Sequence, residues 1–251
     1  MMATPLVVTG MHRSGTSMVA NYLQGCGVDI GDNLQPGDVG NPKGYYEDMD
    51  ILRFHQDLLA YFGVGTFPTG DLEISRQVPE EFRLRVHEIL RRKANSSVWG
   101  WKDCRTSLFL PFWQDMIPEV NFLFLFRHPV SVVASLLRRG TDPSLVRRPA
   151  IAFQSWRLHN ERILDFYRRK QASCFLVDID YLVNNAVAAV SALFSKLDIE
   201  LPVRDFDTVY APAAFKQSGS PPDMYLMLRF PLQTVRCLKL YHAMRELADW
   251  P

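Results

Sequence analysis

The sequence predicts an α/β fold with three layers, in which helices flank a central, mostly parallel sheet. Short apolar runs of strand length alternate along the chain with longer amphipathic segments, as in parallel strands joined by crossover helices. The strand candidates show little alternation of polar and apolar residues, as expected for strands covered on both faces. The 251 residues can bury a large core and no linker divides them, so we expect a single domain over residues 1–251.

Strands are predicted where β-branched or aromatic residues form short runs, at residues 5–10, 98–102, 121–127 and 173–178. Two further segments, residues 63–70 and 211–223, are expected to be irregular. Either could form a lid over a site, although surface loops without a function are commoner.

Helices are predicted at residues 17–24, 79–93, 150–170, 186–197 and 232–247, and Pro129 is expected to begin another. In the segment 79–93 an apolar stripe opposes a charged face, and it consists of Phe82, Val86, Ile89 and Leu90. Trp156, Ile163 and Phe166 form a similar stripe in the segment 150–170. Both stripes are expected to face the core.

The composition is that of an ordinary globular protein and excludes several classes of function. Lys and Arg number 28 and Asp and Glu 27, so a net charge of +1 gives no support to nucleic-acid binding. The four cysteines are scattered without CxxC or zinc spacing, which favours a reducing compartment over a disulfide scaffold. No stretch resembles a signal peptide or a transmembrane segment, so we expect a cytoplasmic protein.

The strongest local signal is the sequence GMHRSGTS, residues 10–17, between the first strand and the first helix. A glycine-containing turn at a helix N-terminus makes an anion cradle, because backbone N–H groups converge there and the helix dipole favours negative charge. The residues expected to bind phosphate are His12, Arg13, Ser14, Gly15, Thr16 and Ser17. The alternative is a tight turn in which Ser14 or Thr16 caps the helix.

The spacing of this loop matches a P-loop, except at one position. A nucleotide-hydrolysing P-loop has Lys directly after its second glycine, where this chain has Thr16. The cation is instead Arg13, inside the loop, from which it could neutralise charge on a leaving oxygen. This difference weakens a kinase or NTPase interpretation without removing the phosphate site.

A second cluster follows the strand candidate at residues 121–127. Arg127 ends that strand, so it is expected at the carboxyl edge of the sheet, where open α/β folds bind ligands. Ser135 lies two turns into the next helix and could reach the same anion. The alternatives are a surface ion pair for Arg127 and a hydroxyl of Ser135 bonded to its own helix. Together with the first loop, the pair suggests two anion-recognition points for one nucleotide.

At this point the chain resembles the sulfotransferases that use 3′-phosphoadenosine 5′-phosphosulfate (PAPS). MHRSGTS is similar to their 5′-phosphosulfate loop, and Arg127 with Ser135 is similar to their 3′-phosphate pair. NPKGYYED from Asn41 and WGWKDCRTSLFLPFW from Trp99 are similar to bacterial members. The resemblance implies a P-loop NTPase-like sulfotransferase fold and transfer of a sulfuryl group from PAPS to a hydroxyl or amine, releasing adenosine 3′,5′-bisphosphate. It implies no metal requirement.

For catalysis, Arg13 and Lys102 are the cationic candidates, because sulfuryl transfer needs charge neutralised on the leaving oxygen. Lys102 could instead be a solvated charge at a strand end. A general base must take the acceptor's proton. Many family members have His two residues after the Lys, where this chain has Cys104.

Glu47, Asp48 and Asp103 remain as base candidates, with His55 behind them. Glu47 is favoured, since other branches of the family use a Glu on the segment after the first helix. For Glu47 and Asp48, the alternative is an acidic first turn of the following helix.

The adenosine side matches the family less closely. Tyr181 is expected in the core rather than against adenine, and Lys216 and Ser218 match a late basic segment only loosely.

Two other functions stay open, namely a P-loop kinase that uses ATP and Mg²⁺ and a nucleotide-binding or partner-binding module without catalysis. The acceptor could be a small molecule, glycan, lipid or peptide. A basic run, Arg138, Arg139, Arg147 and Arg148, would attract an acidic acceptor or simply be a solvated helix end. The sequence indicates no oligomeric state.

Overall fold

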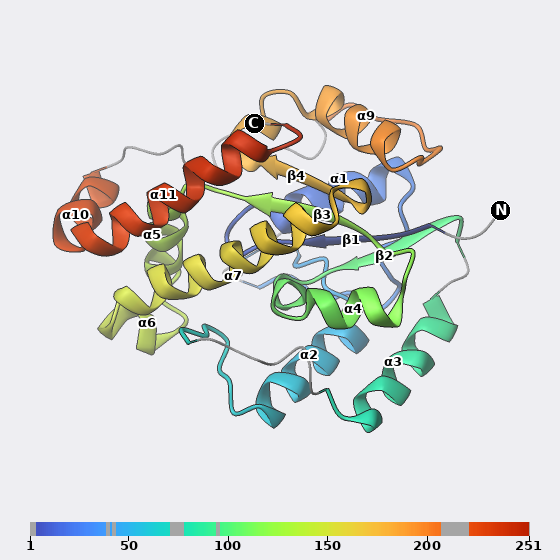
Figure 1. Cartoon of the computed structure of the whole chain (residues 1–251), viewed down its shortest axis with the longest axis horizontal. Helices are drawn as coiled ribbons and strands as arrows, with labels where there is room; N and C mark the ends of the chain where they lie inside the picture. Colours follow the sequence, from blue (N-terminus) through green and yellow to red (C-terminus); the bar gives the residue numbers. More distant parts are fainter. Residues whose placement is uncertain are drawn as a thin grey trace.

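A computed structural model describes residues 4–38, 41, 44–70, 78–93, 96–206 and 221–250. Its centre is a parallel sheet in the order β2-β1-β3-β4 (Figure 1). The strands are β1 (Thr4–Thr9), β2 (Val98–Lys102), β3 (Asn121–Phe126) and β4 (Cys174–Asp178). All four predicted strands are therefore confirmed, three of them with ends shifted by one residue.

The helices of the first half are α1 (Thr16–Cys26), α2 (Met49–Tyr61), α3 (Glu80–Lys93), the 3₁₀ helix η2 (Cys104–Leu108) and α4 (Leu110–Met116). Those of the second half are α5 (Pro129–Arg139), α6 (Pro143–Arg147), α7 (Ala150–Arg169), η3 (Gln171–Ser173), α8 (Ile179–Leu182), α9 (Ala186–Lys196), α10 (Pro221–Arg229) and α11 (Pro231–Leu247). The predicted helices are confirmed within two residues at each end.

Helices cover both faces of the sheet, which confirms the three-layer α/β class (Figure 1). Side chains of successive strand residues point to opposite faces. Val7, Phe122 and Phe124 pack in the core under α2, α3, α4, α5, α7 and α11. Leu6 and Leu123 pack in the core under α1, α8 and α9. This double coverage is the reason why the strand segments are apolar throughout.

Several details differ from the sequence prediction. α1 continues through Gly25 to Cys26 and ends at Gly27, whose φ of 107° closes the helix. Leu90, expected on the buried stripe of α3, is only half-buried, because the stripe ends with Ile89. Residues 63–70 are irregular as predicted. Of the segment 211–223, residues 221–223 begin α10 instead, and the rest lies outside the described residues, as do Lys216 and Ser218.

All four cysteines are buried and none forms a disulfide, which agrees with the expectation from their spacing. Within the described residues, every helix is too short or too polar to cross a lipid bilayer.

The carboxyl ends of the parallel strands meet at one edge of the sheet. β1 leads there into the loop at Gly10, and β2 ends there in Lys102. β3 is followed at that edge by Arg127, and β4 runs into α8, which carries Asp180. The topology thus gathers at one edge the residues that the sequence singled out far apart along the chain.

Candidate active site

The loop between β1 and α1 leaves the start of α1 without a side-chain cap. Gly15 is the N-cap residue, with φ of 81°, and within the described part of the chain the helix start has no side-chain cap hydrogen bond. The alternative in which Ser14 or Thr16 caps α1 is therefore wrong. Arg13 also has a positive φ, 69°, which is uncommon for a residue with a Cβ and concentrates at functional sites. The N–H groups of the first turn of α1 can thus serve an anion.

Two further observations concern the walls of this loop. A Cβ on Gly10 would lie 2.1 Å from the carbonyl oxygen of Leu125, so glycine is required there by the neighbouring strand β3. The Ser14 side chain is fully buried, and its Oγ has no hydrogen-bond partner among the described residues. A buried hydroxyl of this kind costs free energy unless a ligand or water pairs with it.

Two arginines, the partly buried Arg13 and the buried Arg127, join this loop to the second cluster. The Nε of Arg13 donates to the Oγ of Ser135 at 2.9 Å, and the Nη1 of Arg127 donates to the carbonyl oxygen of Arg13 at 3.4 Å. The two anion-recognition points predicted from the sequence are thus in direct contact. Burial lowers the pKa of Arg13, and the nearby charges of Arg139 and Arg127 lower it further. An anion bound here would relieve this repulsion between like charges.

Asp180, which the sequence analysis missed, faces the second cluster. Its Oδ1 lies 3.5 Å from the Nε of Arg127. Burial lowers the pKa of Arg127, and the Asp180 charge opposes that shift. Tyr181, expected in the core, is 44% exposed, so that prediction is wrong. The reason is that Ile179 and Leu182 supply the buried positions of the short helix α8.

Replacing Asp180 with Asn is expected to raise the affinity for adenosine 3′,5′-bisphosphate about fivefold, because it removes a carboxylate that competes with a phosphate for Arg127. Isothermal calorimetry measures this change. Asp165→Asn on the exposed side of α7 removes the same charge far from Arg127 and should leave the affinity unchanged. Weaker binding by Asp180→Asn would contradict the expectation, since Asp180 would then contact the ligand itself.

Lys102 and Glu47 form a buried ion pair at the end of β2. The Nζ of Lys102 donates to the Oε1 of Glu47 at 2.5 Å and to the carbonyl oxygen of Tyr45 at 3.3 Å. Only 2% of the Lys102 side chain and 5% of the Glu47 side chain are exposed, so neither is a solvated surface charge. Burial acts to lower the pKa of Lys102, but the Glu47 carboxylate outweighs it and the pKa is raised. Lys102 is therefore held as a cation.

Arg105, also missed from the sequence, completes this cluster. Its Nη1 lies 3.0 Å from the Oδ1 of Asp103 and 3.4 Å from the Oε2 of Glu47. Lys102 and Arg105 thus balance the two carboxylates in a buried network. Such a network tolerates burial only because every charge has an opposite partner.

The carboxylate of Asp103 is held by hydrogen bonds within the protein. Its Oδ1 accepts from the backbone N–H of Arg105 at 2.7 Å, and its Oδ2 lies 3.1 Å from the Nδ1 of His55. The Nε2 of His55 accepts from the indole N–H of Trp113 at 3.0 Å, so the proton of the neutral ring sits on Nδ1 and is donated to Asp103. Burial opposes ionisation of Asp103, but Arg105 and His55 prevail and lower its pKa.

Cys104 occupies the position where the resemblance led us to expect His. Its thiol lies 3.6 Å from the hydroxyl of Thr16, and burial raises its pKa above the ordinary value. The thiol therefore stays protonated at neutral pH and is a poor base.

His12 makes ring contacts with the segment 63–70 and with α7. Its ring packs 5.4 Å from the ring of Phe67 and 6.4 Å from that of His159, both measured between centroids. The Nε2 atoms of His12 and His159 are buried and have no partner among the described residues. Burial and the charge of Arg105 lower the pKa of His12 well below its ordinary value.

The hydrogen bonds of His159 define its tautomer. Ser107 must donate its one hydroxyl proton to the carbonyl oxygen of Cys104, at 2.8 Å, so the Nδ1–H of His159 donates to the Oγ of Ser107 at 2.6 Å. The Nε2 of His159 thus carries a lone pair. Burial and the charge of Arg162 lower the pKa of His159 to about 3, so the ring is neutral.

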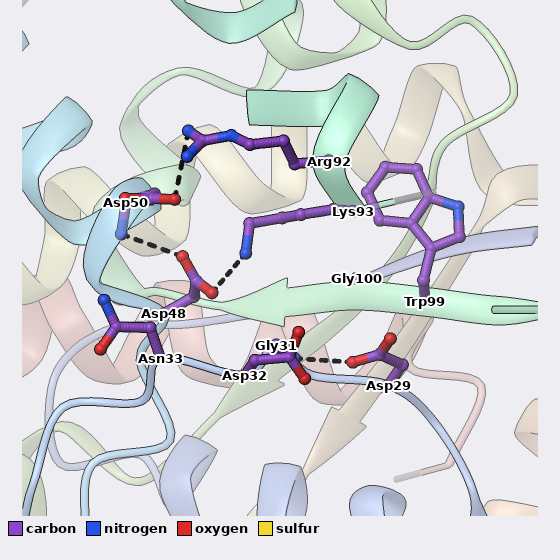
Figure 2. Close-up of a pocket in the computed structure, with 10 residues that line it drawn as sticks. All are labelled: Asp29, Gly31, Asp32, Asn33, Asp48, Asp50, Arg92, Lys93, Trp99 and Gly100. Carbon is purple, nitrogen blue, oxygen red and sulfur yellow. Dashed lines mark hydrogen bonds and ion pairs between the residues drawn. The ribbon is translucent and has the colours of Figure 1, made fainter. Parts of the chain in front are cut away.

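A separate cavity of about 240 Å³ lies against Trp99 and Gly100 of β2 and is also lined by Asp48, the residue that follows Glu47 in the chain (Figure 2). The carboxylates of Asp29, Asp48 and Asp50 are engaged within the protein. Asp50 pairs with Arg92, and Asp48 pairs with Lys93 (Figure 2). Asp48 also caps α2 by accepting from the backbone N–H groups of Asp50 and Ile51. The alternative in which the acidic residue stabilises the start of the helix is thus confirmed for Asp48. Glu47 instead accepts a hydrogen bond from Lys102. We assign the residues of this cavity a structural role. Their contacts hold Asp48 in place and thereby the backbone next to Glu47.

Replacing Asp48 with Ala is expected to lower the free energy of unfolding by about 2–4 kcal/mol, because it removes a helix cap and leaves Lys93 partly buried without its partner. Thermal unfolding followed by circular dichroism measures the loss. Asp48→Asn keeps the cap and should recover part of it. Asp57→Ala breaks only the exposed pair with Arg85 and should cost less than about 1 kcal/mol. Equal losses for Asp48→Ala and Asp57→Ala would contradict this role.

The solved structures that are similar to this chain are bacterial sulfotransferases. The sulfotransferase domain of the Synechococcus PCC 7002 olefin synthase has a TM-score of 0.53 and 17% identity, over 99% of this chain and 97% of that one. Sulfotransferase STF9 from Mycobacterium avium has a TM-score of 0.57 and 12% identity, over 100% and 78%. A sulfotransferase from Alicyclobacillus acidocaldarius has a TM-score of 0.51 and 15% identity, over 97% and 99%.

No protein-family model and no curated protein sequence matches the chain. Identities this low show a common fold, and function has to be argued from the site. The chain therefore has the P-loop-like α/β fold of these sulfotransferases.

Proposed function

We propose that the chain is a sulfotransferase that moves a sulfuryl group from PAPS to an acceptor hydroxyl or amine and releases adenosine 3′,5′-bisphosphate. One observation carries the proposal, namely that the partly buried Arg13 and the buried Arg127, at an uncapped helix start, share one sheet edge with the buried pair of Lys102 and Glu47. The fold of the similar structures supports it. We include a cytoplasmic location in the proposal.

The residues present fit a donor with two phosphate positions. The loop at residues 12–17 supplies the first turn of α1 and the unpaired, buried hydroxyl of Ser14 for a 5′-phosphate. Arg127 and Ser135 would hold a 3′-phosphate. The lowered pKa values of Arg13 and Arg127 support the same assignment, because a bound anion stabilises two neighbouring guanidinium groups that are partly or wholly withdrawn from water.

Lys102, Arg13 and Glu47 are the residues that act on the sulfuryl group and the acceptor. PAPS, when bound, supplies a sulfuryl group joined to its 5′-phosphate. Lys102 and Arg13 neutralise negative charge that develops on the oxygen between phosphorus and sulfur. Glu47 takes the proton from the acceptor hydroxyl as its oxygen attacks sulfur. Lys102 thus has to exchange part of its contact with Glu47 for the leaving oxygen, which frees a carboxylate oxygen for the acceptor.

Glu47 is a better base than the other candidates on this geometry. Both oxygens of Asp103 are held, by the backbone N–H and Nη1 of Arg105 and by His55, and its pKa is lowered. Glu47 also contacts two cations, but its contact with Lys102 is one that the proposed step itself releases. The Nε2 of His55 already accepts from Trp113, so it has no free lone pair. The orientation of His12 toward Phe67 and His159 suggests that it faces the acceptor rather than the phosphates.

The first experiment is calorimetry with adenosine 3′,5′-bisphosphate, adenosine 5′-phosphate and ATP with Mg²⁺. A sulfotransferase should bind the bisphosphate most tightly, because only that ligand fills both phosphate positions. Preference for ATP with Mg²⁺ would favour the kinase. Tight bisphosphate binding without donor cleavage in the presence of phenols, polyols or amines would favour a module without catalysis. Equal, weak binding of all three would exclude a nucleotide site at this edge.

A further inference from the structure

An exposed apolar face lies on α10 and the start of α11, at the end of the molecule toward which β3 points (Figure 1). Four large apolar side chains there are mostly exposed: Leu228 by 81%, Leu232 by 72%, Tyr225 by 64% and Met224 by 60%. Isolated apolar residues on a surface are ordinary, but a contiguous group on adjoining helices marks an interaction site.

A groove of about 480 Å³ adjoins this face, between α5 and α10. Leu137 on α5 lines it on one side, and Tyr225, Leu226 and Phe230 line it on the other. Arg138 and Arg229 are the charged residues of its wall. An apolar slot flanked by guanidinium groups has the chemistry to take an apolar chain that ends in an anionic head.

The surroundings of the groove are basic. In the segments 129–148 and 221–239 the exposed charged side chains are all positive: Arg138, Arg147, Arg148, Arg229, Arg236 and Lys239. Of the two carboxylates described in these segments, Asp223 is 4% exposed, and Asp142 caps α6 at the surface by accepting from the backbone N–H and the hydroxyl of Ser144. α5, α6 and α10 gather at one end of the molecule, which concentrates this charge (Figure 1).

We propose that the exposed face of α10 and α11, together with the α5–α10 groove, attaches the protein to a bilayer surface that contains anionic phospholipid. Apolar side chains enter the boundary between headgroups and acyl chains, and the surrounding cations pair with lipid phosphates. A second copy of the chain fits less well, because a twofold contact through this face would bring Arg229 and Arg236 of both copies together. The proposal does not depend on the proposed catalytic function.

The test is flotation of the full chain with vesicles of phosphatidylcholine alone or of phosphatidylcholine and phosphatidylglycerol in equal parts. We expect binding to the anionic vesicles that weakens as salt is raised. Arg229→Gln with Arg236→Gln should weaken binding about fivefold for each charge removed. Leu228→Ser with Leu232→Ser should reduce it tenfold or more, because two apolar side chains no longer enter the bilayer.

Matched controls come from α3, at the other end of the molecule (Figure 1). Leu84 is 59% exposed there and Arg91 is exposed, so Leu84→Ser and Arg91→Gln repeat both kinds of change outside the proposed face. Both controls should bind vesicles as the unaltered chain does. Affinity for adenosine 3′,5′-bisphosphate, measured on every variant, shows that each is folded and separates this test from that of the catalytic proposal.

Three results would overturn the attachment site. The first is a failure to float with anionic vesicles at low salt, and the second is equal binding to neutral and anionic vesicles. The third is a dimer in light scattering that Leu228→Ser with Leu232→Ser converts to monomer without any vesicle binding, since the face would then join two copies of the chain.

Discussion

Replacing Lys102 with Met is expected to slow cleavage of PAPS by about 10²–10³-fold, the usual cost of losing one group that stabilises charge in a transition state. The Lys102 side chain is 2% exposed and lies at the end of β2, where it is held as a cation by Glu47. The measurement is release of adenosine 3′,5′-bisphosphate, with phenols, polyols and amines offered as acceptors.

The design separates catalysis from folding. Met keeps the length of the apolar stem, and Arg105 remains beside Glu47 to balance its charge. Affinity for the bisphosphate should fall much less than the rate. Lys170→Met removes the same charge from an exposed position and should leave the rate unchanged. Lys102→Arg, which keeps the charge, should recover part of the rate. A rate unaffected by Lys102→Met would contradict the catalytic assignment.

Replacing Arg127 with Ala is expected to weaken binding of adenosine 3′,5′-bisphosphate by about 30- to 1,000-fold, the range for truncating one member of a buried, hydrogen-bonded charge pair. The side chain is 6% exposed, and its backbone carbonyl is fixed by the indole N–H of Trp156 at 3.2 Å. Calorimetry measures the change. The change reports mainly on the 3′-phosphate, because Arg127 contacts Asp180 and the backbone of Arg13 rather than Lys102.

Adenosine 5′-phosphate is the matched control ligand, and its affinity should change little in Arg127→Ala. Arg168→Ala removes the same charge from an exposed position on α7 and should have a small effect on both ligands. An equal loss for the two nucleotides in Arg127→Ala would contradict a specific 3′-phosphate contact, since it would indicate a general loss of positive potential.

The fold was largely predictable because its strands are buried on both faces. Apolar runs such as residues 121–126 can then be recognised by composition alone, and the α/β alternation follows from their spacing. Helix ends were less exact, as the continuation of α1 through Gly25 shows. A glycine inside a helix costs only about 1 kcal/mol, which packing against the sheet can outweigh.

The contacts between site residues that lie far apart in the sequence could not be predicted. Lys102 and Glu47 were separate candidates, and only the fold shows that residues 55 positions apart share a hydrogen bond. Arg105 and Asp180 were missed because the sequence does not indicate in which direction a charged side chain points. His159 did leave a signal, since it falls on the apolar stripe of α7 between Trp156 and Ile163, where a polar residue has to find a buried partner.

The neutral imidazoles of His12 and His159 have a consequence for acid stability. Once unfolded, both regain the ordinary histidine pKa near 6.5, whereas in the fold both pKa values are lowered, that of His159 to about 3. As pH falls below 6.5, the unfolded chain takes up protons that the native state refuses, so each histidine destabilises the fold by up to about 1.4 kcal/mol per pH unit until its native pKa is reached. The buried polar interior thus makes this molecule sensitive to acid and suits it to neutral or mildly alkaline surroundings.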